Sequence, residues 1–100
     1  MLTWLVTYHC KPGQREAFRS EIAKLGVRET SAHESGNLGY DYYLSEADPD
    51  ALLLVERWTD SASQAAHTWT ETFSALQELK ARYCDDVEID KYEREDESRG

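Results

Sequence analysis

The arrangement of apolar and polar positions predicts strands in four stretches of the chain. Residues 2–10 and 52–55 have apolar side chains on both parities, which is typical of strands covered on both faces. Residues 38–45 alternate between a more apolar and a more polar side, and residues 85–93 predict a last strand with Val87 and Ile89 inward. The loop at residues 46–50 predicts an antiparallel hairpin between the second and third strands.

A helical period predicts a first helix that begins near Gln14 and ends before residue 35. Phe18, Ile22 and Leu25 fall at helical spacing and predict its inner face. Gly26 lies inside this segment, where a glycine costs about 1 kcal/mol relative to alanine. A close approach of the helix to the sheet would explain that glycine.

A second helical segment begins at Ser61, which forms a predicted capping box with Gln64. Threonines at positions 68, 70 and 72 are poor helix formers, and Thr68 with Glu71 makes a second possible capping box. We therefore expect an irregular turn just after His67. The predicted inner positions are Ala62, Ala65, Ala66, Trp69, Phe73, Leu76 and Leu79.

The order of elements is strand, helix, strand, strand, helix, strand. It predicts an α+β, ferredoxin-like βαββαβ fold, with two helices on one face of a four-stranded antiparallel sheet. Residues 1–93 form one domain in this interpretation, and residues 94–100 form a charged tail that we expect to be loose. Because two helices cover one face, we expect a second copy of the chain to cover the other, which predicts a homodimer.

The composition of the chain limits the classes of binding partner that we expect. The net charge of -9 disfavours nucleic acid and anionic membrane surfaces, because binding to them relies on Lys and Arg. No apolar run approaches about 20 residues, and the first residues lack signal-peptide features, so we expect a cytoplasmic protein. Cys10 and Cys84 lack metal-ligand spacing and are expected to be free thiols.

Candidate chemistry concentrates in residues 51–67, a predicted strand–turn–helix unit. His67 is a candidate base, since an imidazole titrates near neutral pH, although a packed histidine that bridges helix and sheet is the alternative. Trp58 either stacks on a flat substrate or belongs to the core. Glu56 on a buried strand requires a charged partner such as Arg57 or a lysine, or a position at a pocket.

Three tyrosines of the second strand add hydroxyl groups that an oxygenated substrate or a dimer interface could use. They are Tyr40, Tyr42 and Tyr43, and the alternation of the strand prevents all three from facing one place. His9 and His33 have no partner at metal-ligand spacing and are expected to be solvated or packed.

From residue 2 to about residue 92 the chain resembles the antibiotic biosynthesis monooxygenase family, and within it the quinol monooxygenase-like proteins. The matching motifs are KPGQREAF, GNLGYDYYLSEADPD, LLLVERWTD followed by AAH, and LKARYCDDVEIDKYE. The resemblance implies a dimeric α+β barrel with a pocket between sheet and helices in each subunit. It also implies that oxygen reacts with a deprotonated aromatic quinol or polyketide-like anthrone, without a metal, haem or flavin cofactor.

The resulting site hypothesis has His67 as the catalytic residue, with Tyr40, Glu56, Trp58, Trp69 and Phe73 at the substrate pocket.

Haem-degrading members of the family use an Asn on the first strand, a Trp and a later His. The first strand here has no Asn, and the other two positions hold His67 and Gln77, so haem degradation is not expected. Two alternatives to the monooxygenase remain open, a non-catalytic small-molecule-binding or stress-response dimer and an isomerase of the same fold.

Overall fold

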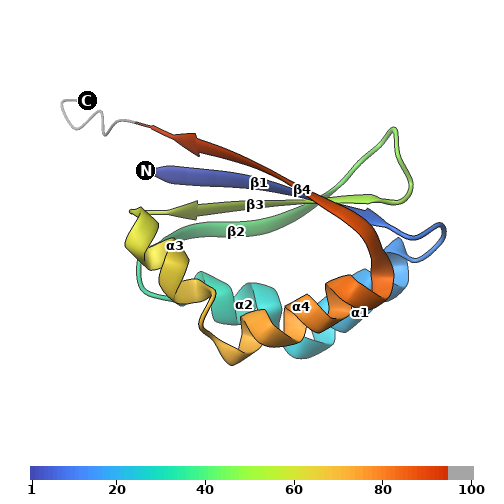
Figure 1. Cartoon of the computed structure of the whole chain (residues 1–100), viewed down its shortest axis with the longest axis horizontal. Helices are drawn as coiled ribbons and strands as arrows, with labels where there is room; N and C mark the ends of the chain where they lie inside the picture. Colours follow the sequence, from blue (N-terminus) through green and yellow to red (C-terminus); the bar gives the residue numbers. More distant parts are fainter. Residues whose placement is uncertain (95–100) are drawn as a thin grey trace.

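The computed structural model of this chain describes residues 1–94 and confirms the ferredoxin-like fold. Its strands are β1 (Leu2–Cys10), β2 (Asn37–Leu44), β3 (Ala51–Trp58) and β4 (Cys84–Glu93), and they form one antiparallel sheet in the order β2-β3-β1-β4. The two strands with apolar residues on both parities, β1 and β3, are the central ones, as expected from their composition. All helices lie on one face of the sheet (Figure 1).

Each of the two predicted helices is divided into two: α1 (Arg15–Leu25), α2 (Val27–Ala32), α3 (Ser61–His67) and α4 (Glu71–Tyr83). Gly26 separates α1 from α2 in a left-handed conformation with φ 64°. A Cβ at Gly26 would meet nothing nearer than Glu29 Oε1 at 4.0 Å. The predicted continuous helix and close approach to the sheet are therefore wrong, and backbone freedom explains this glycine.

The predicted break after His67 is confirmed, but both predicted caps are displaced. Asp60, and not Ser61, caps α3, because its carboxylate accepts from the backbone N–H of Ser63 at 2.8 Å. Thr70, and not Thr68, caps α4 by accepting from the Phe73 N–H at 3.1 Å. In each case, a side-chain oxygen within two residues of the predicted cap accepts a hydrogen bond from a free N–H group of the first helical turn.

The core lies between the helices and the even-numbered side chains of the central strands. Phe18 and Ile22 of the predicted inner face are buried, but Leu25 is 44% exposed. Val27 is fully buried instead, because the break at Gly26 rotates the second half of the segment. The other core residues include Val6, Tyr8, Leu52, Leu54, Leu76 and Leu79.

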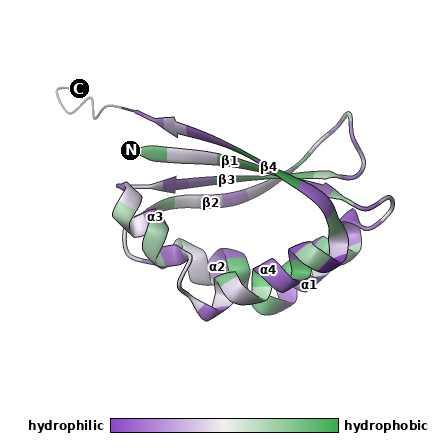
Figure 2. Cartoon of the chain, in the orientation of Figure 1, coloured by the Kyte–Doolittle hydropathy of each residue, from purple (hydrophilic) through white to green (hydrophobic). Residues whose placement is uncertain are grey.

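The opposite face of the sheet has no helix over it within residues 1–94 (Figure 1). Leu5, Leu53 and Val55 are only partly covered there, and Tyr43 is 52% exposed. Figure 2 shows that β4 at the sheet edge is mainly hydrophilic, and on its open side Glu88 pairs with His9. This face is thus apolar along the central strands and charged toward β4.

The backbones of Met1 and Arg94 pair with each other at 2.8 Å in both directions. The remainder of the predicted loose tail lies outside the described residues. Cys10 and Cys84 are free thiols, as expected. Over residues 1–94 no helix is long and apolar enough to span a membrane.

Candidate functional site

A cavity of about 220 Å³ lies between the helix-covered face of the sheet and the α3–α4 unit. All four strands and both of these helices contribute to it, so residues far apart in the sequence meet there. The lining residues are Trp4, Val6, Tyr8, Tyr40, Glu56, Gln64, Ala65, His67, Thr68, Phe73, Leu76, Lys80 and Ile89. Four of the six residues predicted for the site, Tyr40, Glu56, His67 and Phe73, are among them.

His67 is the last residue of α3, and the break that follows it directs the ring toward the sheet. Its side chain is buried, and the ring centroid lies 5.2 Å from that of Trp58, 5.3 Å from Phe73 and 5.7 Å from Tyr40. His67 Nδ1 lies 2.7 Å from Glu34 Oε1. An ionised carboxylate can only accept, so with Glu34 ionised Nδ1 is the donor, and the neutral form of the ring then carries its lone pair on Nε2.

The Glu34–His67 contact depends on a tight approach at Gly36. This glycine has φ 83°, and a Cβ there would lie 2.1 Å from Ser63 Oγ in the first turn of α3. The Thr59 N–H also donates to the Gly36 carbonyl at 2.8 Å. The turn after α2 is therefore pressed against α3, which brings Glu34 beside the end of that helix. Sequence reasoning missed Glu34, since 33 residues separate it from His67.

Glu56 and Trp58 lie two residues apart on the helix-covered face of β3. The Trp58 indole N–H donates to Glu56 Oε1 at 2.8 Å. Burial raises the pKa of Glu56, although the Trp58 hydrogen bond, the imidazolium form of His67 and the ammonium of Lys80 act in the opposite direction. Glu56 is thus at the pocket and not paired with Arg57, which is exposed. Trp58 is fully buried behind Glu56 and His67 and does not line the cavity, contrary to the prediction.

Two residues that line the cavity carry a buried donor without a regular hydrogen-bond partner among residues 1–94. The two donors are the Tyr40 hydroxyl and the Trp4 indole N–H. Tyr40 lies close to the hydroxyls of Tyr42 and Ser31 without forming a regular hydrogen bond, and burial raises its pKa. The Tyr40 hydroxyl therefore has polar neighbours outside the cavity, whereas the Trp4 indole N–H has none among residues 1–94, and an unpaired buried donor favours a polar ligand.

In the α3–α4 unit, one residue predicted to line the cavity does not line it, and one residue that was not predicted does. Trp69, expected at the pocket, is 88% exposed in the turn between the helices and does not line the cavity. Lys80, which was not singled out, does line it. Its spacing of seven residues from Phe73 on α4 places both on the same helical face, and this lysine on an apolar stripe was the available signal.

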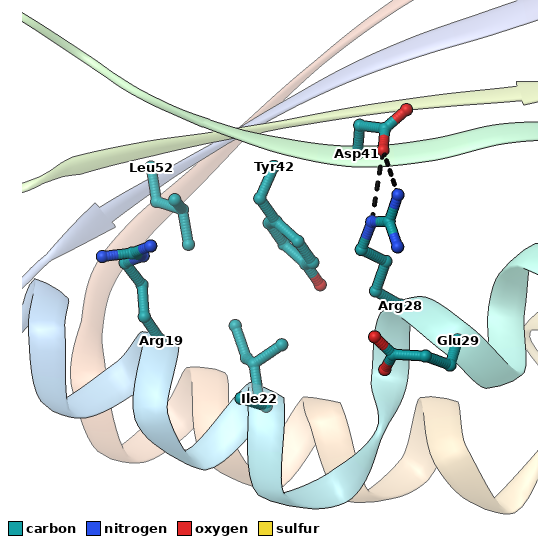
Figure 3. A pocket seen from close by; sticks show the side chains of 8 residues that line it. Arg19, Ile22, Arg28, Glu29, Asp41, Tyr42 and Leu52 are labelled. Carbon is teal, nitrogen blue, oxygen red and sulfur yellow. Dashed lines mark hydrogen bonds and ion pairs between the residues drawn. The ribbon is translucent and has the colours of Figure 1, made fainter.

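A second cavity of about 260 Å³ lies beside β2, against α1 and α2 (Figure 3). Ile22, Leu52 and the ring of Tyr42 form its apolar part, and Arg28 Nη2 pairs with Asp41 Oδ1 at 2.9 Å near its edge. No histidine lines it. The cavity at His67 therefore differs from it in having an imidazole among its lining residues. In the described part of the chain, no three His, Cys, Asp or Glu side chains are grouped as metal ligands would be.

The family model described as antibiotic biosynthesis monooxygenase matches residues 1–79. The chain belongs to this family. The match includes Glu34, Glu56 and His67 but ends one residue before Lys80.

The chain is also 35% identical, over 66 residues, to the Bacillus subtilis protein named "Putative monooxygenase YcnE", covering 66% of this chain and 67% of that one. The crystal structure of PA3566 from Pseudomonas aeruginosa is similar, with 29% identity, a TM-score of 0.84 and coverage of 95% and 94% of the two chains. A structure from Nitrosomonas europaea that carries the family's name has 25% identity and a TM-score of 0.85, covering 94% of this chain and 98% of that one. The α+β fold is shared by these structures.

Proposed function

We propose that this protein is a cofactor-independent monooxygenase that oxidises a small aromatic quinol with molecular oxygen. The observation that supports this best is the Glu34–His67 pair, at 2.7 Å, beside a cavity with Tyr8, Tyr40 and Phe73 around it. An imidazole oriented by a carboxylate is suited to accept a proton, and aromatic side chains suit a flat ring. Membership of the monooxygenase family supports the same reaction class.

The proposed reaction requires a general base and a site from which bulk water is excluded. A phenolic hydroxyl of the quinol gives its proton to His67 Nε2, and Glu34 stabilises the imidazolium through Nδ1. The electron-rich anion transfers one electron to oxygen, and recombination of the radical pair forms a ring C–O bond in a peroxide anion. This anion takes back the proton held by His67, which gives a hydroperoxide and restores the neutral imidazole. Loss of water from the hydroperoxide leaves a hydroxyquinone. One oxygen atom thus enters the product, and the other leaves as water.

The size of the cavity favours a single-ring substrate over a multi-ring polyketide. Its volume of about 220 Å³ exceeds the roughly 150 Å³ of an engineered cavity that binds benzene, but it falls below the usual range for larger ligands. In this proposal Tyr40 and Phe73 contact the ring, and Glu56 and Trp58 support the sheet side of the pocket. Trp69 has no role within one subunit.

We also propose that two copies of the chain associate through their open sheet faces. The partly covered Leu5, Leu53 and Val55 support this, because a monomer would leave these central strands without a second layer.

The test of the function is His67→Ala. We expect the variant to remain folded and to lower quinol-dependent oxygen uptake at least about 10-fold, since a positioned base contributes typically about 10²–10⁴. His33→Ala is the matched control, because this exposed histidine binds the Glu29 carbonyl on the surface. If wild-type protein takes up no more oxygen than the buffer with every single-ring quinol tried, the binding protein or the isomerase replaces this proposal.

A further inference from the structure

Lys80 is an ammonium group at an aromatic cavity without an acidic partner. Its Nζ lies 5.6 Å from the ring centroid of Phe73 and 5.9 Å from that of Tyr8, within the range of cation–π contact. Lys80 is half-buried and forms no ion pair within residues 1–94. A cation that is partly removed from water and not paired normally costs stability, so a compensating role at the cavity is expected.

Within residues 1–94, the acids that face the cavity form no direct ion pair with Lys80. Glu56 accepts from the Trp58 indole, and Glu34 is bonded to His67. Neither carboxylate comes within ion-pair distance of Nζ. Burial lowers the pKa of Lys80, with Cys84 and Glu56 acting in the opposite direction. The ammonium donors are therefore left for a group inside the cavity.

The other unpaired donors of the cavity point to the same ligand chemistry. The Trp4 indole N–H and the Tyr40 hydroxyl lack partners, and both residues line the cavity together with Lys80. His67 and Lys80 also share one neighbour, since the Phe73 ring contacts both. An imidazole and a cation thus both contact a single aromatic side chain.

We propose that Lys80 binds the oxyanion of an ionised phenol, so that the cavity selects the monoanion of a single-ring diol over its neutral form. This inference rests on the proposed function for the identity of the site, but it concerns binding and not turnover. An ammonium beside the phenolate favours the charged form of the ligand, and a neutral quinone product loses that interaction. Lys80 thereby assists both deprotonation of the substrate and release of the product.

Nitrocatechol is the probe, because its visible absorbance reports whether the bound ring is neutral or ionised. Spectral titrations with the whole chain between pH 5 and 8 should show the bound phenol ionising at lower pH than the free one. We expect Lys80→Met to weaken binding of the anion at least about 10-fold, which corresponds to one unit in the pKa of the bound ligand. Lys80→Arg should retain most of the preference for the anion.

Lys24→Met is the matched control, because Lys24 is exposed on α1 and pairs with Glu21 at 3.1 Å. It should bind nitrocatechol as the wild type does. Lys80→Met should fold at least as stably as the wild type, since it removes a desolvated charge. Binding of the nitrocatechol anion is measured without turnover, so a wild type that binds the anion but takes up no oxygen retains this inference and refutes the proposed reaction. Equal anion affinity in Lys80→Met and wild type, or no binding of nitrocatechol to the wild type, overturns the proposal.

Discussion

At the scale of single residues, the cavity is built from side chains that a core would normally exclude. Glu56 is 5% exposed on a central strand, and it keeps one hydrogen bond, from the Trp58 indole. Burial raises its pKa because the charged form loses more hydration than its neighbours return. A carboxylate in this setting is a cost to folding that a functional role would explain.

The pH dependence of stability tests this interpretation of Glu56. Its pKa in the folded protein is raised above the unfolded value, so the folded state holds the proton more tightly. Stability contributed by this group is therefore lost as pH rises above the unfolded pKa of about 4.5. We expect Glu56→Gln, whose amide oxygen still accepts from Trp58, to gain stability relative to wild type between pH 5 and pH 8. Urea unfolding of both proteins at the two pH values measures the gain.

Glu46→Gln is the control for that comparison, because Glu46 is exposed in the β2–β3 loop. Its stability difference from wild type should not change with pH. A constant or shrinking difference for Glu56→Gln would mean that the buried carboxylate is not the group that loses stability.

At the scale of elements, two glycines with positive φ have different physical reasons. Gly26 sits in open space and provides only the left-handed turn between α1 and α2. Gly36 provides a left-handed conformation and also the room for Ser63 and Thr59, whose side-chain oxygens would lie 2.1 Å and 2.9 Å from an added Cβ. The second glycine therefore controls how closely the turn at Glu34 approaches α3.

Substitution of Gly26 and of Gly36 by alanine distinguishes a requirement for backbone conformation alone from an added requirement for space. Gly26→Ala should lower the free energy of unfolding by about 1 kcal/mol, the conformational cost of a left-handed non-glycine residue. Gly36→Ala adds a steric clash and should cost at least about 2 kcal/mol. Because it also moves the turn away from α3, it should reduce oxygen uptake as well, whereas Gly26→Ala should not. Chemical unfolding and activity of the two variants, side by side, provide the measurement, and equal losses would contradict the assigned close approach.

At the scale of the whole molecule, the helices of residues 1–94 cover only one of the two sheet faces, and this difference predicts a dimer. One face is covered by all four helices, while Leu53 and Val55 on the other are only partly covered by their own chain. We expect a dimer in light scattering that persists on dilution, since burying these central strands stabilises the pair. Leu53→Asp should shift the protein toward monomer.

Leu25→Asp is the matched control for the dimer. Leu25 is 44% exposed but lies on α1, on the helical side of the molecule. Its substitution should leave the mass in solution unchanged. A wild-type chain that stays folded and monomeric at nanomolar concentration would refute the proposed interface.

The sequence by itself determined the elements and their order. The apolar parities of β1 and β3 identified the central strands, and the threonines after His67 identified the helix break, because these signals are local. The position of each cap was displaced by one or two residues, since Asp60 and Ser61 are both suitable caps and only backbone geometry distinguishes them. The break at Gly26 was missed because a single glycine is compatible with either a helix interior or a helix end.

Only the tertiary structure decided which side chains meet at the cavity. Helical periodicity assigned both Phe73 and Trp69 to an inner face, but the turn between α3 and α4 leaves the Trp69 indole exposed, whereas Phe73 lines the cavity. The pairing of His67 with Glu34 follows from the close contact at Gly36. The place of Lys80 follows from how α4 packs over β1. A local pattern specifies the face on which a residue lies, whereas its partners depend on how whole elements pack, and that information is not contained in any short stretch of sequence.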